Sequence, residues 1–209
     1  MHLYSFFRSS AAYRLRIALN LKGLSYEMSS IVFSKNEHLT PEYRAVNPQM
    51  RVPTLELDDG ERLIQSLALI EYLDEVHPQP PLLPIDPIDR AHARAIAQIV
   101  ACDIHPLNNI GALNYIRKNF GQSEDAVNAW YHNWVVAGFE AIEALIEPGP
   151  YAAGPQVTIA DICLVPQVYN ARRFKVSLDK FPKIVAADAA CASIAAFEAA
   201  KPENQPDAQ

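Results

Sequence analysis

The first 23 residues, MHLYSFFRSSAAYRLRIALNLKG (Met1–Gly23), decide the fold. The short apolar run from Leu3 to Phe7 is typical of a strand, and a helix with apolar residues at helical spacing follows directly. Gly23 stands where the C-terminal cap of that helix is expected. Ser9 and Ser10 both suit the N-cap, because a serine hydroxyl there accepts a hydrogen bond from a free amide of the first turn.

The junction between this strand and this helix is suited to binding an anion. Free amides and the positive end of the helix dipole both point at it. Helix N-termini also lower the pKa values of thiols, so the anion can be a thiolate. The turn itself has no cysteine, since Ser9 and Ala12 take the places of the two cysteines of a Cys-x-x-Cys site. A thiol that reacts here must be brought in, which points to glutathione.

Five prolines from Pro78 to Pro87 mark a domain boundary, because they exclude both a helix and a central strand. Before them, strand and helix signals alternate, and Asp58-Asp59-Gly60 predicts a hairpin turn. Ser66 is a candidate N-cap for the helix that follows the hairpin. We therefore predict a thioredoxin-like α/β domain over residues 1–78, a linker over 79–87 and an all-helical domain over 88–209. The strands are expected at residues 3–7, 26–33, 53–57 and 62–64.

The second half of the chain has helical patterns only. One stripe of apolar residues at helical spacing predicts a long helix: Val127, Trp130, Trp134, Ala137, Ala141 and Leu145. Thr158 and Asp161 form a predicted capping box, and Pro166 is expected to kink the helix that it starts rather than end it. Residues 202–209 are expected to form a loose polar tail.

Five stretches in this order resemble the zeta class of glutathione transferases, which contains the maleylacetoacetate and maleylpyruvate isomerases. Together they span nearly the whole chain. They are FRSSAAYRLRIALNLKG (7–23), NPQMRVPTLELDDG (47–60), LIQSLALIEYLDE (63–75), CDIHPLNN (102–109) and TIADICLVPQVYNARRFKVSLDKFP (158–182). One departure is Ala11, where the family has Cys or Thr.

The resemblance implies the glutathione transferase architecture, α/β plus all-α, with glutathione as cofactor. It implies a cis bond before Pro53, so that the backbone of Val52 pairs with the cysteinyl unit of glutathione. It also implies that His38 contacts glutathione. Gln65 and Ser66 begin a second helix, whose N-terminus fits the γ-glutamyl carboxylate. The alternatives are that Pro53 is an ordinary proline at the start of a strand, that Ser66 serves only as an N-cap, and that His38 is a surface histidine.

In the helical domain, the resemblance places Asp103, His105 and Asn109 at the wall of the glutathione site. It implies a homodimer, in which Asp103 of the partner subunit meets the glutathione ammonium. From the residues alone, Asp103 and His105 beside Pro106 also fit a capped bend. Some bacterial maleylpyruvate isomerases carry an arginine just after the two asparagines, where this chain has Ile110-Gly111.

The catalytic residues expected from this resemblance are Ser9 or Ser10, which would stabilise the thiolate, together with Arg8 and Arg173. The two arginines would bind the carboxylate and the carbonyl of the substrate and stabilise the charge that develops on it. For any single arginine, a surface salt bridge is the alternative interpretation.

Composition sets further limits. The net charge of −6 argues against a nucleic-acid partner. The three cysteines form no disulfide or metal motif and are expected to be reduced and mostly buried, and no two of the six histidines are three or four residues apart, so we expect no metal site. Neither a signal peptide nor a transmembrane stretch is apparent, which predicts a cytoplasmic protein without membrane contact.

Three functions fit these observations. The first is a glutathione-dependent isomerase that converts maleylacetoacetate or maleylpyruvate to the fumaryl product; the residues do not decide between these substrates. The second is a general glutathione transferase, or one that removes halide from small haloacids. The third is a non-catalytic scaffold. Ala11, in place of the family's Cys or Thr, would fit a scaffold, whereas the retained glutathione contacts would not.

Overall fold

The computed structural model describes residues 1–208, which form two compact units. The first unit joins Met1–Leu82 to the described residues from Ala192 onward, and the second is Leu83–Cys191. The sequence placed residues 192–209 in the helical domain, whereas the structure packs their described part with the N-terminal residues.

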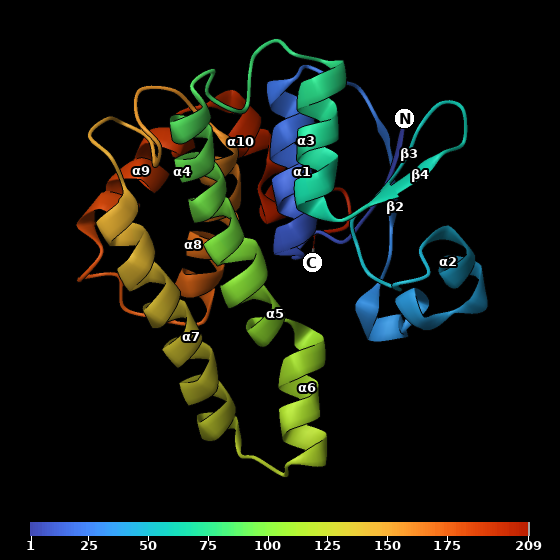
Figure 1. The fold of residues 1–209 in the computed structure, drawn as a ribbon. Helices are drawn as coiled ribbons and strands as arrows, with labels where there is room; N and C mark the ends of the chain where they lie inside the picture. Colours follow the sequence, from blue (N-terminus) through green and yellow to red (C-terminus); the bar gives the residue numbers. More distant parts are fainter. Residues whose placement is uncertain (209) are drawn as a thin grey trace. The chain divides into compact units, whose positions relative to one another are not determined.

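The first unit contains a four-stranded sheet with the order β2-β1-β3-β4 (Figure 1). Strand β2 is parallel to β1, while β3 and β4 are antiparallel to their neighbours. The fully buried Leu3 pairs with Met28 on one side and with Leu55 on the other. This mixed sheet confirms the predicted thioredoxin-like fold. The strands are β1 His2–Ser5, β2 Glu27–Ser30, β3 Thr54–Glu56 and β4 Arg62–Ile64.

Two helices lie side by side against this sheet: α1 (Ser10–Leu21) and α3 (Ser66–Val76) (Figure 1). Helix α1 ends as its sequence predicts, since Gly23 has a φ of 65° and the amide of Leu24 donates to the carbonyl of Leu19. Between β2 and β3 the chain forms three short helices. These are η1 Phe33–Lys35, η2 Glu37–Leu39 and α2 Pro41–Val46.

A buried lysine joins the C-terminal ends of α1 and α3. Nζ of Lys22 donates to Oδ1 of Asp74 and to the carbonyls of His77 and Pro80, each at 2.6 Å. The Lys22 side chain has no exposed surface. Three oxygen acceptors satisfy all three donors of the ammonium, so the proline-rich segment is fixed where it leaves α3.

The C-terminal segment is folded as far as residue 208, so the expectation of a loose tail is wrong for the described residues. Helix α10 (Ala195–Ala200) packs against α1, and the 3-10 helix η4 (Pro202–Asn204) follows it. Nε2 of the buried Gln205 then donates to the carbonyls of Ala199 and Lys201. These bonds fold the segment back on itself, which a polar composition alone does not reveal.

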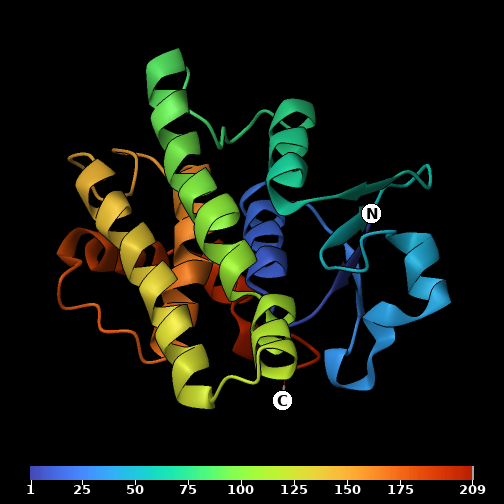
Figure 2. The same cartoon turned by 60° about the horizontal axis from the view of Figure 1, so that its bottom comes forward.

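The second unit is helical throughout its regular elements, with α4 packed against α7 and α8 (Figure 2). Helix α4 continues into a π-helical segment, η3, just before Pro106. The elements are α4 Pro87–Gln98, η3 Ile99–Ile104, α5 His105–Asn108, α6 Ile110–Asn119, α7 Glu124–Leu145, α8 Ile159–Arg173 and α9 Pro182–Ala192.

The predicted long helix is present as α7, but the apolar stripe that indicated it is not the face that the helix buries. The residues that the helix buries are Val127, Tyr131, Val135, Phe139 and Ile142. Only Val127 belongs to both sets, while Trp130 and Leu145 are exposed. Helix α7 carries apolar residues on more than one side. Two aromatic contacts decide which side is buried: Tyr131 stacks on Phe174, and Phe139 meets Phe181 edge to face.

The predicted capping box starts helix α8. The amide of Thr158 donates to Oδ2 of Asp161 at 2.9 Å, and the amide of Ala152 donates to Oδ1 at 2.7 Å. Burial raises the pKa of Asp161, while these amides act in the opposite direction. The helix continues through Pro166 to Arg173, as expected. Within residues 1–208, no helix combines the length and the apolar character needed to cross a bilayer.

Candidate functional site

The turn after β1 presents Arg8 and Ser9. The amide of Ser9 donates to the carbonyl of Phe6 at 2.9 Å, which closes a tight turn. Arg8 is exposed, and its guanidinium carbon lies 4.8 Å from the centre of the Phe7 ring. Ser9 is the N-cap of α1, and its Oγ accepts from the amide of Ala12 at 3.2 Å. Because that bond uses a lone pair, the Ser9 O–H remains a donor for an anion at this turn.

Ser10 is the first residue of α1 and is almost fully buried. The sequence left both serines as N-cap candidates, and the structure assigns the cap to Ser9. The next residue, Ala11, has no polar side-chain atom. The donors of this turn are therefore the serine hydroxyls and the amides of the first helical turn.

The buried Arg16 holds the backbone of this turn in place. Arg16 donates from Nη2 to the carbonyl of Phe7 at 3.0 Å, from Nη1 to Oγ of Ser5 at 3.1 Å and from Nε to the carbonyl of Ala200 at 3.1 Å. It has no exposed surface. Burial lowers the pKa of Arg16 to about 10, and Asp207 is among the groups that act in the opposite direction.

The second helix N-terminus is built differently from the prediction. Gln65, with a φ of 73°, is the N-cap of α3, and Ser66 is the first helical residue. The assignment of Ser66 as N-cap is therefore wrong by one residue. Oγ of the buried Ser66 accepts from Nη1 of Arg14 at 3.3 Å, and Nε2 of Gln65 donates to Oε1 of Gln49. The Arg14–Ser66 bond links the two helix starts.

The peptide bond between Val52 and Pro53 is cis, as the resemblance implies. The carbonyl just before it, that of Arg51, accepts from the hydroxyl of Tyr43 at 2.7 Å and from Nδ2 of Asn47 at 2.8 Å. Both donor side chains are buried. Tyr43 and Asn47 therefore fix the backbone that leads to Val52, a role that the sequence analysis missed.

His38 belongs to the same part of the first unit. Its ring lies 4.4 Å from that of Phe33, which in turn stacks on Phe6 at the start of the turn. Nδ1 of His38 is buried and has no hydrogen-bond partner among residues 1–208. Burial lowers the pKa of this imidazole, which favours its neutral form. Val52 and Ala12 share the apolar cluster that Phe6 and Phe33 border.

The predicted residues of the second unit lie along one segment. Asp103 is exposed in the π-helical η3, and His105 begins α5. Asn109 is the N-cap of α6, and its Oδ1 accepts from the amide of Ala112 at 3.1 Å. Cys102 is exposed here, whereas Cys163 and Cys191 are buried, so the cysteines are mostly buried, as expected.

Arg173 ends helix α8 and is exposed, with its guanidinium carbon 4.6 Å from the centre of the Phe174 ring. Tyr131 stacks on the same ring, and its carbonyl accepts from Nδ2 of Asn108. Burial raises the pKa of Tyr131 to about 12, while Arg173 acts in the opposite direction. Tyr131 therefore connects Arg173 to Asn108, in the segment that also contains Asp103, and no sequence signal indicates this contact. The neighbouring Arg172 pairs with Asp188.

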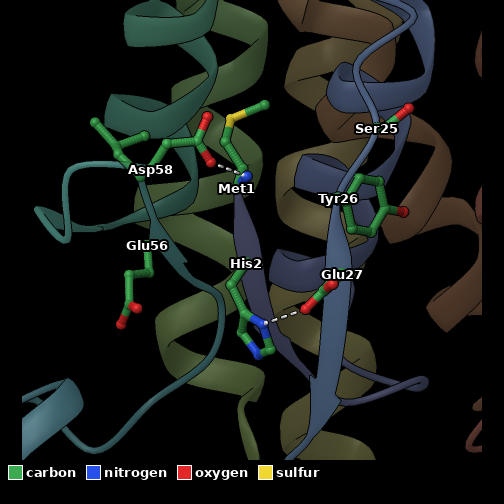
Figure 3. A pocket seen from close by; sticks show the side chains of 8 residues that line it. Met1, His2, Ser25, Tyr26, Glu27, Glu56 and Asp58 are labelled. Atoms are coloured by element: carbon green, nitrogen blue, oxygen red, sulfur yellow. Dashed lines mark hydrogen bonds and ion pairs between the residues drawn. The ribbon is translucent and has the colours of Figure 1, made fainter.

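An open hollow of about 570 Å³ lies at the other end of β1. Figure 3 shows the amine of Met1 facing Asp58, and the ring of His2 facing Glu27. None of the predicted site residues lines this hollow. The hollow lies at one end of the sheet, and its acidic residues Asp58 and Glu27 form ion pairs with Met1 and His2.

Comparison with known proteins decides the family. The family model of the glutathione S-transferase N-terminal domain matches residues 3–81. A maleylpyruvate isomerase of a Ralstonia species is 51% identical over 99% of both chains. A maleylacetoacetate isomerase of Pseudomonas aeruginosa is 47% identical over 99% of this chain and 98% of its own. The chain belongs to the zeta class of glutathione transferases.

Solved structures agree with this membership. The holo structure of a maleylpyruvate isomerase, described as a bacterial zeta-class glutathione transferase, superimposes with a TM-score of 0.97, at 51% identity and full coverage of both chains. A maleylacetoacetate isomerase of Methylobacterium extorquens with bound malonate and glutathione gives a TM-score of 0.96, at 34% identity and full coverage of both chains. The fold expected from the resemblance is thus confirmed.

Proposed function

We propose that this protein is a glutathione-dependent cis–trans isomerase that converts maleylacetoacetate or maleylpyruvate to the fumaryl product. The observation that carries the proposal is the 51% identity to a maleylpyruvate isomerase over 99% of both chains. The geometry of the turn at Arg8 and Ser9 agrees with it. We further propose that the reaction belongs to the breakdown of aromatic compounds in the cytoplasm.

The donors of the first unit fit glutathione. A thiolate and a carboxylate are both anions, and each is stabilised by hydroxyls and free amides at a helix start. Helix α1 offers such a start at Ser9 and Ser10, and α3, with 11 residues, offers another at Ser66. We assign the thiol to the first and the γ-glutamyl carboxylate, with Gln65, to the second. The backbone of Val52 beside Pro53 would hold the cysteinyl unit, and His38 would contact the peptide.

Glutathione, when bound, supplies a thiolate that adds reversibly to the alkene and so permits rotation about the former double bond. The protein has to keep the sulfur ionised. Lowering a thiol pKa from about 8.5 to below 7 requires about 2 kcal/mol of differential stabilisation. One hydroxyl hydrogen bond and a helix N-terminus together supply an energy of this order. The Ser9 hydroxyl can therefore serve, with Ser10 and the turn amides as its helpers, although Ala11 has no donor.

The charge that develops on the substrate oxygens needs cationic donors. Arg8 and Arg173 are exposed guanidiniums, each lying against an aromatic ring, at 4.8 Å from Phe7 and 4.6 Å from Phe174. Stacking restricts the guanidinium, so less entropy is lost when it binds a carboxylate. We assign substrate binding and charge stabilisation to these two residues. Asp103, His105 and Asn109 are proposed to contribute to the glutathione site.

Replacing Arg8 or Arg173 with alanine should lower kcat/KM for the maleyl acid by about tenfold to a hundredfold, since each change removes a charge-assisted hydrogen bond. The pKa of bound glutathione should stay nearly unchanged. Steady-state kinetics and thiolate absorption measure the two quantities. The matched control is Arg117→Ala, because Arg117 pairs with Glu124 on the surface. An unchanged kcat/KM for the maleyl acid at saturating glutathione, with or without a raised KM for glutathione, would contradict the assignment.

Two other functions share the glutathione contacts, and an assay separates them. The purified protein is given glutathione with maleylpyruvate, maleylacetoacetate, a chlorodinitrobenzene-type acceptor and a small haloacid in turn. We expect the rate of isomerisation to be much higher than the rates of conjugation and halide release. Faster conjugation or halide release would indicate a general transferase. Absence of all turnover, together with no retention on immobilised glutathione, would indicate a scaffold.

We propose a homodimer, in which Asp103 of each protomer approaches the glutathione ammonium of its partner. Ile85 and Ile88 support an association surface, because they are 93% and 67% exposed at the start of the helical unit. Sedimentation at micromolar concentration should give twice the chain mass of 23.2 kDa. Ile88→Asp should shift this equilibrium toward the monomer. A wild-type monomer would refute the assembly.

A further inference from the structure

We propose that Asp207, near the C-terminus, is a positioning residue of the active site: it holds the amide of Phe7 and so fixes the turn that presents Arg8 and Ser9. The inference rests on the proposed function in assigning this turn to glutathione and substrate. It goes beyond that function because it makes the C-terminal segment a support of the reactive turn.

The two polar backbone groups of Phe7 are held by opposite charges. Its amide donates to Oδ2 of Asp207 at 3.0 Å, and its carbonyl accepts from Nη2 of Arg16 at 3.0 Å. Phe7 directly precedes Arg8, and the carbonyl of Phe6 accepts from the amide of Ser9. Each backbone group of Phe7 thus has a charged partner, and charge-assisted hydrogen bonds are about twice as strong as neutral ones.

The side chains of Asp207 and Arg16 also interact electrostatically. Asp207 acts to raise the pKa of Arg16, against the lowering effect of burial. Oδ1 of Asp207 is buried and has no hydrogen-bond partner among residues 1–208. A nearby positive charge favours a carboxylate that has a buried oxygen without a hydrogen-bond partner, and Arg16 supplies such a charge.

The C-terminal segment is braced to place Asp207 at the turn. Nε2 of Gln205 donates to the carbonyls of Ala199 and Lys201 at 2.9 and 2.8 Å, and the amide of Ala208 donates to the carbonyl of Gln205 at 3.0 Å. Arg16 also donates to the carbonyl of Ala200 at the end of α10. Residues 199–208 therefore form a folded support against the turn.

Because both the amide and the carbonyl of Phe7 are held, the donors of the turn are in place before glutathione binds. Less ordering is then needed when the thiolate arrives, which favours the ionised form and the reaction. Without Asp207 the amide of Phe7 is released, and the backbone of Arg8 and Ser9 gains freedom. The expected consequence is a loss of rate with little change in how well the peptide part of glutathione is held.

Amide exchange measured by NMR tests the contact directly in protein labelled with 15N-phenylalanine and without glutathione. Asp207→Ala should accelerate exchange of the Phe7 amide by about tenfold or more. Asp207→Asn should restore most of the protection, because its amide oxygen still accepts. The control Asp58→Asn makes the same change of charge at the other end of β1, where Asp58 pairs with the N-terminal amine. It should leave Phe7 unchanged.

Kinetics test the consequence. Asp207→Ala should lower kcat for isomerisation by about tenfold near neutral pH and raise the pKa of bound glutathione, while KM for glutathione changes by less than about twofold. Asp207→Asn should recover most of kcat. Unchanged Phe7 exchange in Asp207→Ala, or faster exchange with unaltered kcat and thiolate pKa, overturns the inference. If the wild type shows no glutathione-dependent isomerisation, the proposed function fails instead, and Phe7 exchange still decides the contact.

Discussion

Ser9→Ala is expected to lower isomerase turnover near pH 7 by about tenfold and to raise the pKa of glutathione bound to the protein. Oγ of Ser9 already accepts from the amide of Ala12, so its hydrogen is the part available to an incoming sulfur. Losing one hydrogen bond to an ionised group costs about 1.5–3 kcal/mol, which corresponds to at least one pKa unit. The rate should recover as the pH rises, because more thiolate then forms without the hydroxyl. The pH–rate profile and thiolate absorption measure both effects.

The control must separate this role from the capping role. Ser123 is the N-cap of α7, and its Oγ accepts from the amide of Ala126 at 3.2 Å, the same distance as in the Ser9 cap. Ser123→Ala should cost about 1 kcal/mol of folding free energy, as Ser9→Ala should, and leave the pH–rate profile unchanged. If Ser9→Ala and Ser10→Ala both leave that profile unchanged, the helix amides alone stabilise the thiolate.

The largest effect on stability is expected from Arg16→Met, which should lower the free energy of unfolding by about 3 kcal/mol or more. The change leaves the carbonyls of Phe7 and Ala200, and the hydroxyl of Ser5, without their buried donor. Arg16→Lys should rescue little, since one ammonium on a flexible stem does not reproduce the planar fork of a guanidinium. Urea denaturation followed by circular dichroism provides the measurement.

Arg62→Met is the matched control within the same unit. Arg62 donates to Glu56 at 2.6 Å, but it lies on the surface. Arg62→Met should lower the free energy of unfolding by only a small fraction of the loss in Arg16→Met, because exposed ion pairs contribute little to stability. Equal losses for the two variants would contradict the structural role of Arg16. The sequence alone, with Arg14 and Arg16 next to apolar residues, gave no reason to expect fully buried guanidiniums.

The parts of the fold that follow from local signals were predictable. The strand–helix junction at Ser9, the hairpin at Gly60 and the capping box at Thr158 each depend on residues close together in the chain. The buried face of α7 was not, because that helix carries several apolar stripes, and contacts with Phe174 and Phe181 select one of them. Long-range packing decided the outcome there.

The site shows the same division. The cis bond before Pro53 was predicted from the resemblance, and an anion-binding turn at Ser9 was predicted from the residues of the turn. The contacts that support this turn could not be predicted from either. Phe7 and Asp207 are 200 positions apart, and Arg16 reaches Ala200 across 184. No local pattern joins such residues, so only the folded chain reveals the contacts between the C-terminal segment and the turn at Phe7.

The central claim is that glutathione is used catalytically by this protein, and product analysis at substoichiometric glutathione tests it most directly. Maleylpyruvate and maleylacetoacetate are each supplied in large excess over glutathione and followed by NMR. The account predicts complete conversion of at least one of them to its fumaryl isomer, with free glutathione recovered at its starting amount. Conversion that stops at one equivalent of glutathione, with a stable thioether as the product, would contradict it.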